Sequence, residues 1–436
     1  MFQRLLLPCI LLISSVLSGQ NPVPAPAQKA PVLIVGAVAH LGNGKIIPNS
    51  AIAFDNGKLT MVADAATSRY DRTKYAKIYD ATGKHVYPGF IAMNTSVGLV
   101  EIEAARATQD FAETGSYNPN VRALVAYNTD SDIPPTLRSN GVLLAQTTPS
   151  GGVLSGQSAV VQMDAWNWED AAVREDGLHL YWPTLRSYGG WETGNPELKK
   201  NEQYDKDVQA LTRFFSEARA YLQTAAPERG NLKFEAMRSL FEGKQNLYIH
   251  TDDAKTIEES VLFAEQFNIT PVLTGASDAW IVTDFLKNHH ISVILAEPQR
   301  VPAREDEDVD QPFKTAAALE KAGIRFAISG VHNSGEMGSS WKQRNLPFQA
   351  GQAVGGGLPY ESAVRAITLD AAAILGIDAT VGSLEVGKDA TLFISEGDAL
   401  DMRTCQVTAA FIQGREINLD NKQKQLARKF EAKYKQ

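Results

Sequence analysis

Residues 246–296 read NLYIHTDDAKTIEESVLFAEQFNITPVLTGASDAWIVTDFLKNHHISVILA, and this stretch decides the fold class. Short apolar runs typical of strands alternate in it with amphipathic runs typical of helices. The expected strands are 247–250, 270–273 and 291–296, and the expected helices are 256–267 and 280–288. A helix at 313–322 and a strand at 324–329 continue the series. This alternation predicts an α/β protein with βα units on a parallel sheet, which an open doubly wound sheet or a closed barrel would satisfy.

The two ends of the chain have a different pattern. Short strands separated by turn signals are expected at 32–36, 51–54 and 59–63, and again at 382–384, 390–394 and 408–412. The turn Asn56-Gly57-Lys58 in the first group has a counterpart, Gln413-Gly414-Arg415, in the second. We therefore expect residues 32–87 and 380–420 to pair into one small β domain that flanks a central domain of residues 88–379.

The first twenty residues have the features of a secretory signal peptide. A short basic start precedes an apolar run, 5–17, that is too short to span a bilayer, and a Pro/Ala-rich linker, 21–31, follows. We therefore expect a secreted or periplasmic protein without a transmembrane segment. Cleavage would leave Cys405 as the remaining cysteine, so no intramolecular disulfide is expected.

Charge gives two further indications about partners. The chain has 50 acidic and 42 basic side chains among 436 residues, a balance that disfavours nucleic acid as a partner. Its last residues, 421–436, are instead basic, and Leu426, Phe430 and Tyr434 recur in them every four positions. This pattern predicts an amphipathic helix, which would either dock onto the acidic body or contact a partner or an anionic surface.

Four motifs stand in order along the chain: YDATGKHVYPGFI at 79–91, GGVLSGQ at 151–157, Ile249-His250, and VGSLEVGKDA at 381–390. Together they resemble the amidohydrolase superfamily, in its imidazolonepropionase-like branch. The resemblance implies a (β/α)₈ TIM barrel flanked by a small composite β-sandwich built from both ends of the chain. It also implies a metal-dependent hydrolase, with zinc as the expected metal, that acts on carbon–nitrogen bonds of small molecules such as cyclic amides.

The resemblance places metal ligands at positions where this chain has other residues. Asn94 and Ser96 stand where the family has two histidines on the first barrel strand, and Ala92 stands where it has an aspartate. The histidine of the sixth strand falls on Thr274 or Gly275, and the aspartate of the eighth strand falls on Val331. His250 alone matches its ligand position, after the fifth strand. Zinc sites use three or four imidazole, thiolate or carboxylate ligands, so we expect a degraded site, with His250 as the only metal ligand, if any.

Other roles are open to the residues of this rim. His250 and His332 are the candidate catalytic residues, and a rim histidine bonded to a neighbour is the alternative for His250. Asp252 and Asp253 are expected to cap the following helix, although they could pair with the histidines. The remaining histidines of strand-like segments, His40, His85 and His179, have no second ligand nearby in the sequence.

Two functions fit these features. The first is an exported hydrolase of carbon–nitrogen bonds with an altered site. The second is a catalytically inactive relative that keeps the fold as a binding module. The expected partner is a small-molecule substrate or ligand, and the second function adds self-association or pairing with an intact amidohydrolase.

Overall fold

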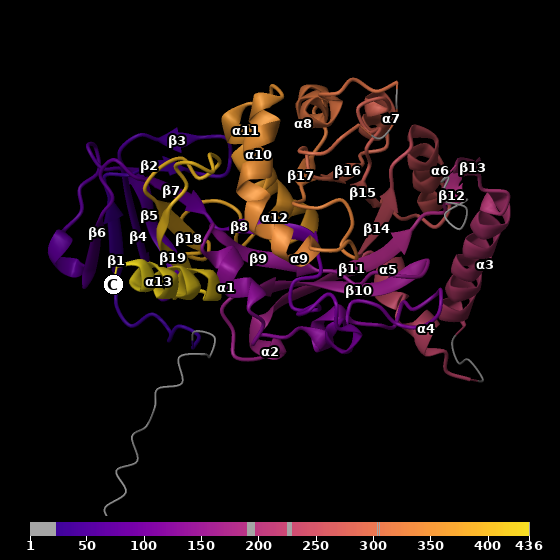
Figure 1. The fold of residues 1–436 in the computed structure, drawn as a ribbon, viewed down its shortest axis with the longest axis horizontal. Coiled ribbons are helices and arrows are strands. Elements are labelled where there is room, and N and C mark those ends of the chain that lie inside the picture. Colours follow the sequence, from indigo (N-terminus) through magenta and orange to yellow (C-terminus); the bar gives the residue numbers. More distant parts are fainter. Residues whose placement is uncertain (1–22, 190–196, 225–228, 303, 305, 436) are drawn as a thin grey trace, which may run out of the picture.

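The computed structural model describes residues 23–189, 197–224, 229–302, 304 and 306–435. The proposed signal peptide, 1–20, lies outside the described residues. Within them, the protein is an α/β structure with a barrel at one end and two small sheets at the other, toward the left in Figure 1. No helix in this part of the chain is long and apolar enough to cross a membrane.

Eight strands form the barrel, and their order in the sheet is the order in the chain. They are β8 (Phe90–Thr95), β9 (Val142–Thr147), β10 (Leu154–Gln162), β11 (Ala172–Tyr181), β14 (Asn246–Thr251), β15 (Val272–Gly275), β16 (Ser292–Leu295) and β17 (Phe326–Ile328). The barrel is nearly closed, because side-chain hydrogen bonds bridge its first and last strands. Ser329 Oγ donates to Met93 O at 3.0 Å, and Asn94 Nδ2 donates to His332 O at 3.3 Å.

The barrel departs from eight βα units at one place. Strand β10 pairs antiparallel with both β9 and β11, whereas the other neighbouring barrel strands pair parallel. The connections 148–153 and 163–171 are too short for a crossover, which takes about a dozen residues or more. Strands β9 to β11 therefore form a meander within the barrel.

Every helix and strand expected between residues 246 and 329 is confirmed within three residues. The longer helices are α3 (Tyr204–Gln223), α6 (Ala254–Glu265), α7 (Thr283–Asn288), α8 (Gln311–Ala322), α10 (Leu346–Gly355), α11 (Tyr360–Ala366), α12 (Leu369–Leu375) and α13 (Lys422–Tyr434). Shorter elements are the helices α1 (Ile133–Arg138), α2 (Trp168–Ala171), α4 (Leu232–Glu235), α5 (Arg238–Phe241) and α9 (Ser339–Lys342), and the hairpin strands β12 (Arg186–Gly189) and β13 (Glu197–Lys200).

The two small sheets join both ends of the chain. One sheet contains β5 (Lys58–Asp64), β4 (Ser50–Asp55), β1 (Val32–Val35) and β6 (Lys77–Asp80), in that order. The other contains β20 (Arg415–Glu416), β19 (Val407–Ile412), β18 (Leu392–Ser395), β7 (His85–Pro88), β2 (Val38–His40) and β3 (Ile46–Ile47). Buried side chains such as Ile34, Phe54 and Phe411 join the two sheets in one core. The strand expected at 382–384 is wrong: this segment is a loop in which Leu384 N bonds Leu41 O at 2.9 Å.

The two predicted turns have the same backbone conformation. Asn56 and Gly57 have φ values of 48° and 78°, and Gln413 and Gly414 have φ values of 49° and 72°. Two successive residues with positive φ make the tight hairpin turn whose twist matches that of the strands. The two turns lie against each other. A Cβ atom added to Gly57 would be 3.0 Å from Gln413 O.

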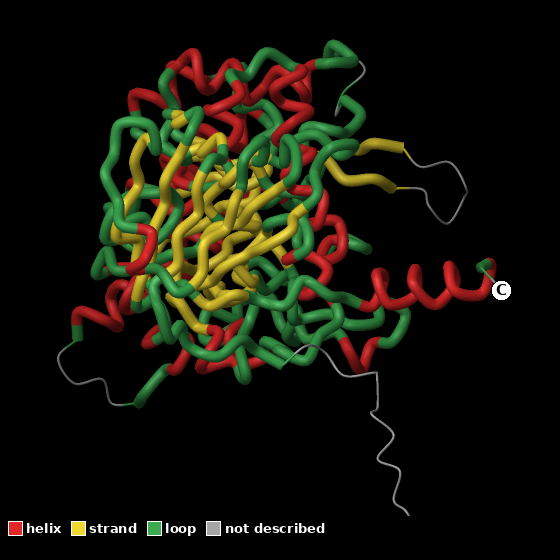
Figure 2. The backbone as a smooth tube through the Cα atoms, turned by 90° about the vertical axis from the view of Figure 1, so that its left-hand side faces the viewer, coloured by secondary structure: helices red, strands yellow, loops and turns green. Residues whose placement is uncertain are grey.

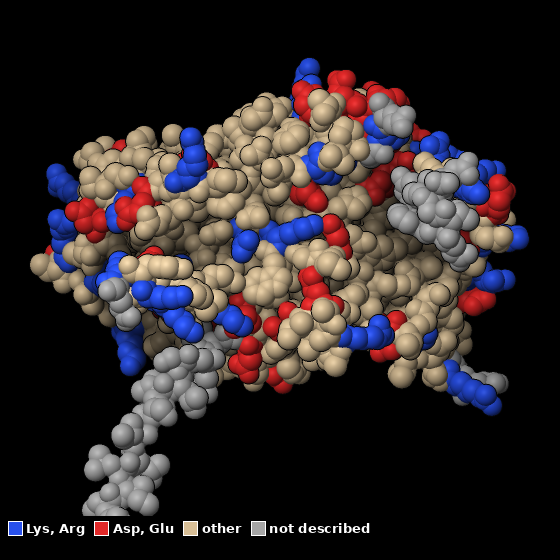
Figure 3. All heavy atoms as spheres, in the orientation of Figure 1, with Lys and Arg blue, Asp and Glu red and all other residues tan. Residues whose placement is uncertain are grey.

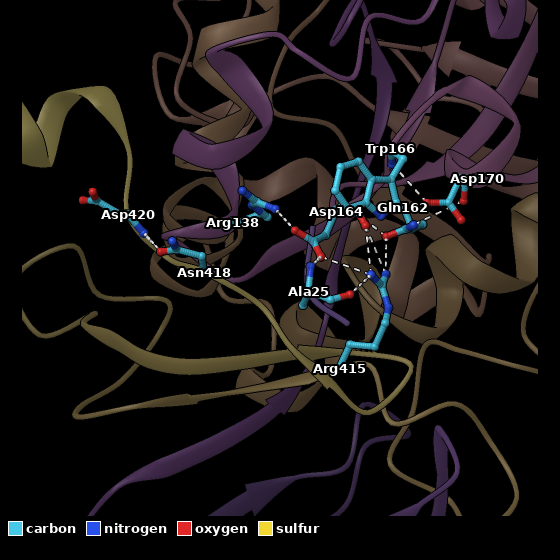
Figure 4. A network of polar contacts seen from close by, with 9 residues as sticks. All are labelled: Ala25, Arg138, Gln162, Asp164, Trp166, Asp170, Arg415, Asn418 and Asp420. Atoms are coloured by element: carbon cyan, nitrogen blue, oxygen red, sulfur yellow. Dashed lines mark hydrogen bonds and ion pairs between the residues drawn. The ribbon is translucent and has the colours of Figure 1, made fainter. Parts of the chain in front are cut away.

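A buried polar junction holds the two ends of the chain to the barrel (Figure 4). The carboxylate of Asp164, after β10, pairs with Arg138 of α1 and, at 3.2 Å, with Arg415 of β20. It also accepts a hydrogen bond from Ala25 N at 2.8 Å, and Arg415 Nη1 donates to Ala25 O at 3.1 Å. The side chain of Asp164 is fully buried, so this junction binds the start of the described chain and the last sheet strand to one carboxylate.

Candidate functional site

A cavity of about 320 Å³ opens at the carboxyl ends of β11, β14 and β15. This is the end of the barrel at which barrel enzymes have their active sites. The segment that follows β17 completes the wall. The cavity is lined by aromatic and polar side chains: Tyr181, Trp182, Pro183, Thr184, His250, Thr251, Asp252, Asp253, Thr256, Thr274, Gly275, His332 and Asn333.

His250 and His179 form a pair at the base of this cavity. Nε2 of His250 lies 2.9 Å from Nδ1 of His179 on the neighbouring strand β11, so one ring nitrogen donates a hydrogen to the other. His250 stacks on Tyr181 with ring centroids 4.0 Å apart, and His179 stacks on Tyr248 with centroids 4.7 Å apart. The two stacked tyrosines thereby hold both imidazoles in this orientation.

Burial keeps both imidazoles neutral. It lowers the pKa of His250 to about 3 and that of His179 well below its ordinary value, because the charged imidazolium would lose its hydration. A histidine with so low a pKa is a weak base, and at neutral pH it lacks the second ring proton with which an imidazolium acts as a general acid. Nε2 of His179 is buried and has no hydrogen-bond partner among the described residues.

Asp252 and His332, which also line the cavity, form a charged pair. His332 Nε2 lies 3.1 Å from Asp252 Oδ2, and Ser277 Oγ donates to Asp252 Oδ1 at 2.7 Å. Burial would raise the pKa of Asp252, but the hydrogen bonds from His332 and Ser277 outweigh it and hold that pKa below its usual value. The hydrogen bond to Asp252 raises the pKa of His332. The pair therefore consists of a carboxylate and an imidazolium below the raised pKa.

The expectation that Asp252 and Asp253 cap the helix is wrong. Asp253 occupies the position before α6, but its side chain makes no capping hydrogen bond. Asp278, from the loop after β15, accepts from Ala254 N at 3.1 Å instead. Asp252 is directed toward His332 and Ser277, which a reading of the local sequence could not reveal, because these residues lie on other barrel segments.

The four positions with substituted ligands have different surroundings. Thr274 pairs in register with His250 and lines the cavity, and its Oγ1 is buried without a partner in the described structure. Asn94 is buried at the end of β8, with φ of 53°, and Oδ1 of its side chain likewise has no partner there. Ser96 Oγ lies 2.8 Å from Ser339 Oγ, away from the cavity lining. Val331 is fully buried and does not line the cavity.

The remaining histidines of strand-like segments, which have no second ligand nearby in the sequence, each contact another histidine in the structure. His179 contacts His250, and His40 Nε2 lies 3.0 Å from His85 Nδ1. His40 Nδ1 also lies 2.7 Å from Glu361 Oε1, between the small sheets and α11. The sequence does contain a signal for His179: in Gly-Leu-His-Leu-Tyr, 177–181, it alternates with leucines and shares a strand face with Tyr181.

The side chains of the barrel mouth do not form a metal centre of the usual kind in the described structure. In residues 23–189, 197–224, 229–302, 304 and 306–435, no three His, Cys, Asp or Glu side chains are grouped so that they could hold a metal ion. Asn94 offers an amide and Thr274 a hydroxyl, which are neutral oxygen ligands that zinc rarely uses.

Comparisons with solved structures agree on the fold. An amidohydrolase from Thermotoga maritima MSB8 is 22% identical, with a TM-score of 0.73 over 89% of this chain and 99% of that chain. Molinate hydrolase is 15% identical, with a TM-score of 0.53 over 90% of this chain and 95% of that chain. An adenosine deaminase from Xanthomonas campestris, solved with bound zinc, is 16% identical, with a TM-score of 0.52 over 90% of this chain and 93% of that chain.

Sequence comparison supplies the family. No curated protein matches this chain. The sequence profile of the amidohydrolase family matches residues 179–417, from the strand that carries His179 to the last strand of the small sheets. This match spans more than half of the 436 residues. The protein therefore belongs to the amidohydrolase family.

Proposed function

We propose that the barrel mouth binds a small molecule and that this family member does not use a metal-activated water there. The observation that carries the proposal is the bond between His250 and His179. The nitrogen of His250 that faces its neighbour is occupied at 2.9 Å by a second imidazole. His250, the residue that matches a metal-ligand position of the family, is thus hydrogen-bonded to a second histidine.

The chemistry of the other side chains supports the same proposal. A zinc ion that activates water needs about three protein ligands and one open position. At this mouth Asp252 is engaged by His332 and Ser277, and Thr274 provides a hydroxyl. Val331, at the aspartate position, has no atom that could bind a metal or accept a proton. This donor set does not fit zinc as the family uses it.

The ligand we propose is a small polar molecule such as a cyclic amide or a dipeptide-like compound. A cavity of about 320 Å³ suits a molecule of that size. The neutral His250 and the unpartnered hydroxyl of Thr274 could bond amide groups, and the rings of Tyr181 and Trp182 offer flat apolar contacts. Membership of the imidazolonepropionase-like branch would favour a cyclic amide.

A second candidate function is hydrolysis of a carbon–nitrogen bond without metal. The Asp252–His332 pair favours it, because an imidazolium held by a carboxylate can donate a proton to a leaving nitrogen. This function would need a water activated by some other group at the mouth. His250, with its pKa lowered to about 3, is a poor choice for that role.

Metal content and hydrolysis together test the proposal. We expect purified protein to hold well under one transition metal per chain, and thermal-shift screening of cyclic amides and dipeptides to find a ligand whose binding is lost in His250→Ala. The matched control is His289→Ala, which removes an imidazole that pairs with Glu265 and does not line the cavity.

About one tightly held metal per chain, lost in His250→Ala, would overturn the proposal. Metal-independent turnover that disappears in Asp252→Asn would instead establish the second candidate.

We also propose that the protein is exported, which its N-terminal sequence supports. Expression of the full chain in a bacterium with a periplasm should yield a product that has lost about twenty residues, as mass spectrometry of the periplasmic fraction would detect. A full-length product retained in the cytoplasm would contradict export. Pairing with an intact amidohydrolase stays a prediction, to be checked by co-purification.

A further inference from the structure

Helix α13, Lys422–Tyr434, is attached to the rest of the protein by its first two turns; in the second turn, Arg428 Nη2 donates to Asp420 Oδ1 at 2.8 Å. Asn421 caps its start by accepting from Lys424 N at 2.9 Å. Lys422 Nζ pairs with Asp132 Oδ2 at 2.6 Å, and Thr136 Oγ1 donates to Gln423 Oε1 at 2.8 Å, which fixes the first turn to α1. Figure 2 shows the rest of the helix extending away from the body, with its C-terminal end farthest out.

The apolar side chains of α13 face solvent. No residue of the helix is buried, and Leu426, Phe430 and Tyr434 are 44%, 52% and 81% exposed. At a spacing of four residues these three side chains form one stripe along the helix. Of the two alternatives that the sequence left open, docking of the apolar face onto the acidic body is therefore not seen in the described residues.

The charge of α13 is opposite to that of the rest of the chain. Residues 422–435 contain six basic side chains and one acidic one, a balance of +5, while the whole chain carries −8. Residues 1–421 therefore carry −13. Figure 3 shows Lys and Arg side chains gathered where Figure 1 places α13. A cationic helix with an exposed apolar stripe thus projects from an anionic protein.

We propose that α13 binds the surface of an anionic phospholipid membrane. A helix with aromatic and aliphatic residues on one face and lysines beside them can lie in the plane of the headgroups, with its apolar face in the acyl boundary. Lys429 and Lys433 flank the stripe, so their ammonium groups could reach anionic headgroups while Phe430 and Leu426 insert. Attachment by the first two turns leaves the later turns, with Phe430 and Tyr434, free to lie on such a surface.

A membrane suits α13 better than a protein groove. A stable protein interface buries about 800 Å² on each partner, whereas this helix of 13 residues offers a stripe of three side chains and is about 20 Å long. A lipid surface needs no matching shape and attracts the charge of the helix directly. The acidic body of a second copy would attract the helix too, and the experiment distinguishes this case.

Vesicle sedimentation of the full chain without its signal peptide tests the proposal. We expect binding to vesicles of phosphatidylglycerol and phosphatidylcholine, none to phosphatidylcholine alone, and weakening by salt. The triple variant Lys429→Gln, Lys433→Gln, Lys435→Gln should bind more than a hundredfold more weakly, at roughly fivefold for each basic residue near the surface. Phe430→Asp should also abolish binding, and it should leave the unfolding transition unchanged because the side chain is exposed.

The control carries the same change of charge elsewhere. Lys206→Gln, Lys287→Gln, Lys321→Gln removes three exposed lysines from α3, α7 and α8 and should bind vesicles like the parent chain. Equal losses in both triple variants would overturn the proposal, as would absence of binding to anionic vesicles. A dimer in light scattering that Phe430→Asp dissociates, without vesicle binding, would assign α13 to a second copy instead.

Discussion

The junction around Asp164 and the mouth of the barrel are both polar, but they differ in how deeply their ion pairs are buried: Asp164 and Arg138 are 0% and 3% exposed, whereas Asp252 and His332 are each 41% exposed. Asp164 accepts from Arg138, Arg415 and Ala25, which come from three separate segments. Within the described chain, Arg138 Nε at the junction has no hydrogen-bond partner, and neither does Thr274 Oγ1, which lines the cavity at the mouth. The junction has the character of a structural network, and the mouth has that of a binding surface.

The two regions therefore differ in their expected roles, which are stability for the junction and ligand binding for the mouth. Breaking the buried ion pairs of Asp164 would leave guanidinium charges buried without their carboxylate, which destabilises the fold. Unsatisfied groups beside a cavity cost stability and are available to a ligand. We therefore expect substitutions at the junction to change folding and leave ligand binding alone, and substitutions at the mouth to do the reverse.

The largest expected effect is at the junction. Asp164→Ala should lower the free energy of unfolding by about 3–5 kcal/mol, because it leaves the buried guanidinium of Arg138 without its carboxylate. Urea denaturation followed by circular dichroism measures the change. Glu416→Gln, which breaks the exposed pair with Lys77, is the control and should change stability by less than ~1 kcal/mol. Equal effects of the two variants would contradict the distinction.

The second effect concerns His250 and acid. Its folded pKa of about 3 lies below the unfolded value, so the unfolded chain binds a proton first as pH falls. The free energy of unfolding should decrease by ~1.4 kcal/mol for each pH unit below about 6.5 through this residue. His250→Phe should show a shallower pH dependence than the parent chain between pH values of roughly 4.5 and 6.5. Parallel profiles would show that His250 is not held neutral.

The sequence supports the prediction of most of the fold, because the relevant patterns are local. Alternating strands and helices between residues 246 and 329 follow from the spacing of apolar residues, and the two Gly turns follow from backbone preference. The antiparallel β10 was not predicted, because strand direction depends on the length of connections whose ends the sequence marks poorly. The strand predicted at Gly382–Leu384 did not form: the segment is a loop, and Leu384 N donates to Leu41 O.

The site was harder to predict than the fold. His250 and His332 could be placed at one rim because one lies at the end of a barrel strand and the other follows a barrel strand. The partner of each histidine comes from elsewhere, His179 from 71 positions earlier and Asp252 from 80 positions earlier. Such pairs depend on the register of distant strands and on ring stacking, which no local pattern encodes. The local expectation for Asp252, a helix cap, failed for that reason.

A smaller change in stability is expected for substitutions of two threonines at the ends of neighbouring strands. Thr274→Val removes a buried hydroxyl without a partner, so it should leave stability unchanged or raise it by up to ~1 kcal/mol, and it should weaken ligand binding. Thr251→Val removes a hydroxyl that donates to Thr256 Oγ1 at 2.7 Å and should lower stability by about 0.5–1.5 kcal/mol. Thermal denaturation of both variants measures these changes. A loss of stability in both would mean that the hydroxyl of Thr274 makes a hydrogen bond that stabilises the fold.

The smallest effect belongs to the pair of Asp252 and His332. The pKa of His332 is raised in the folded protein, so the stability from this pair is present below the unfolded pKa of histidine and is lost as pH rises through the folded value. Both side chains are 41% exposed, so solvent screens the attraction and the contribution should be less than ~1 kcal/mol. Asp252→Asn should move the titration of the His332 ring, followed by NMR, back toward the ordinary histidine value. An unchanged titration in Asp252→Asn would mean that His332 is not paired in solution, and the mouth would then lack the imidazolium on which metal-free hydrolysis depends.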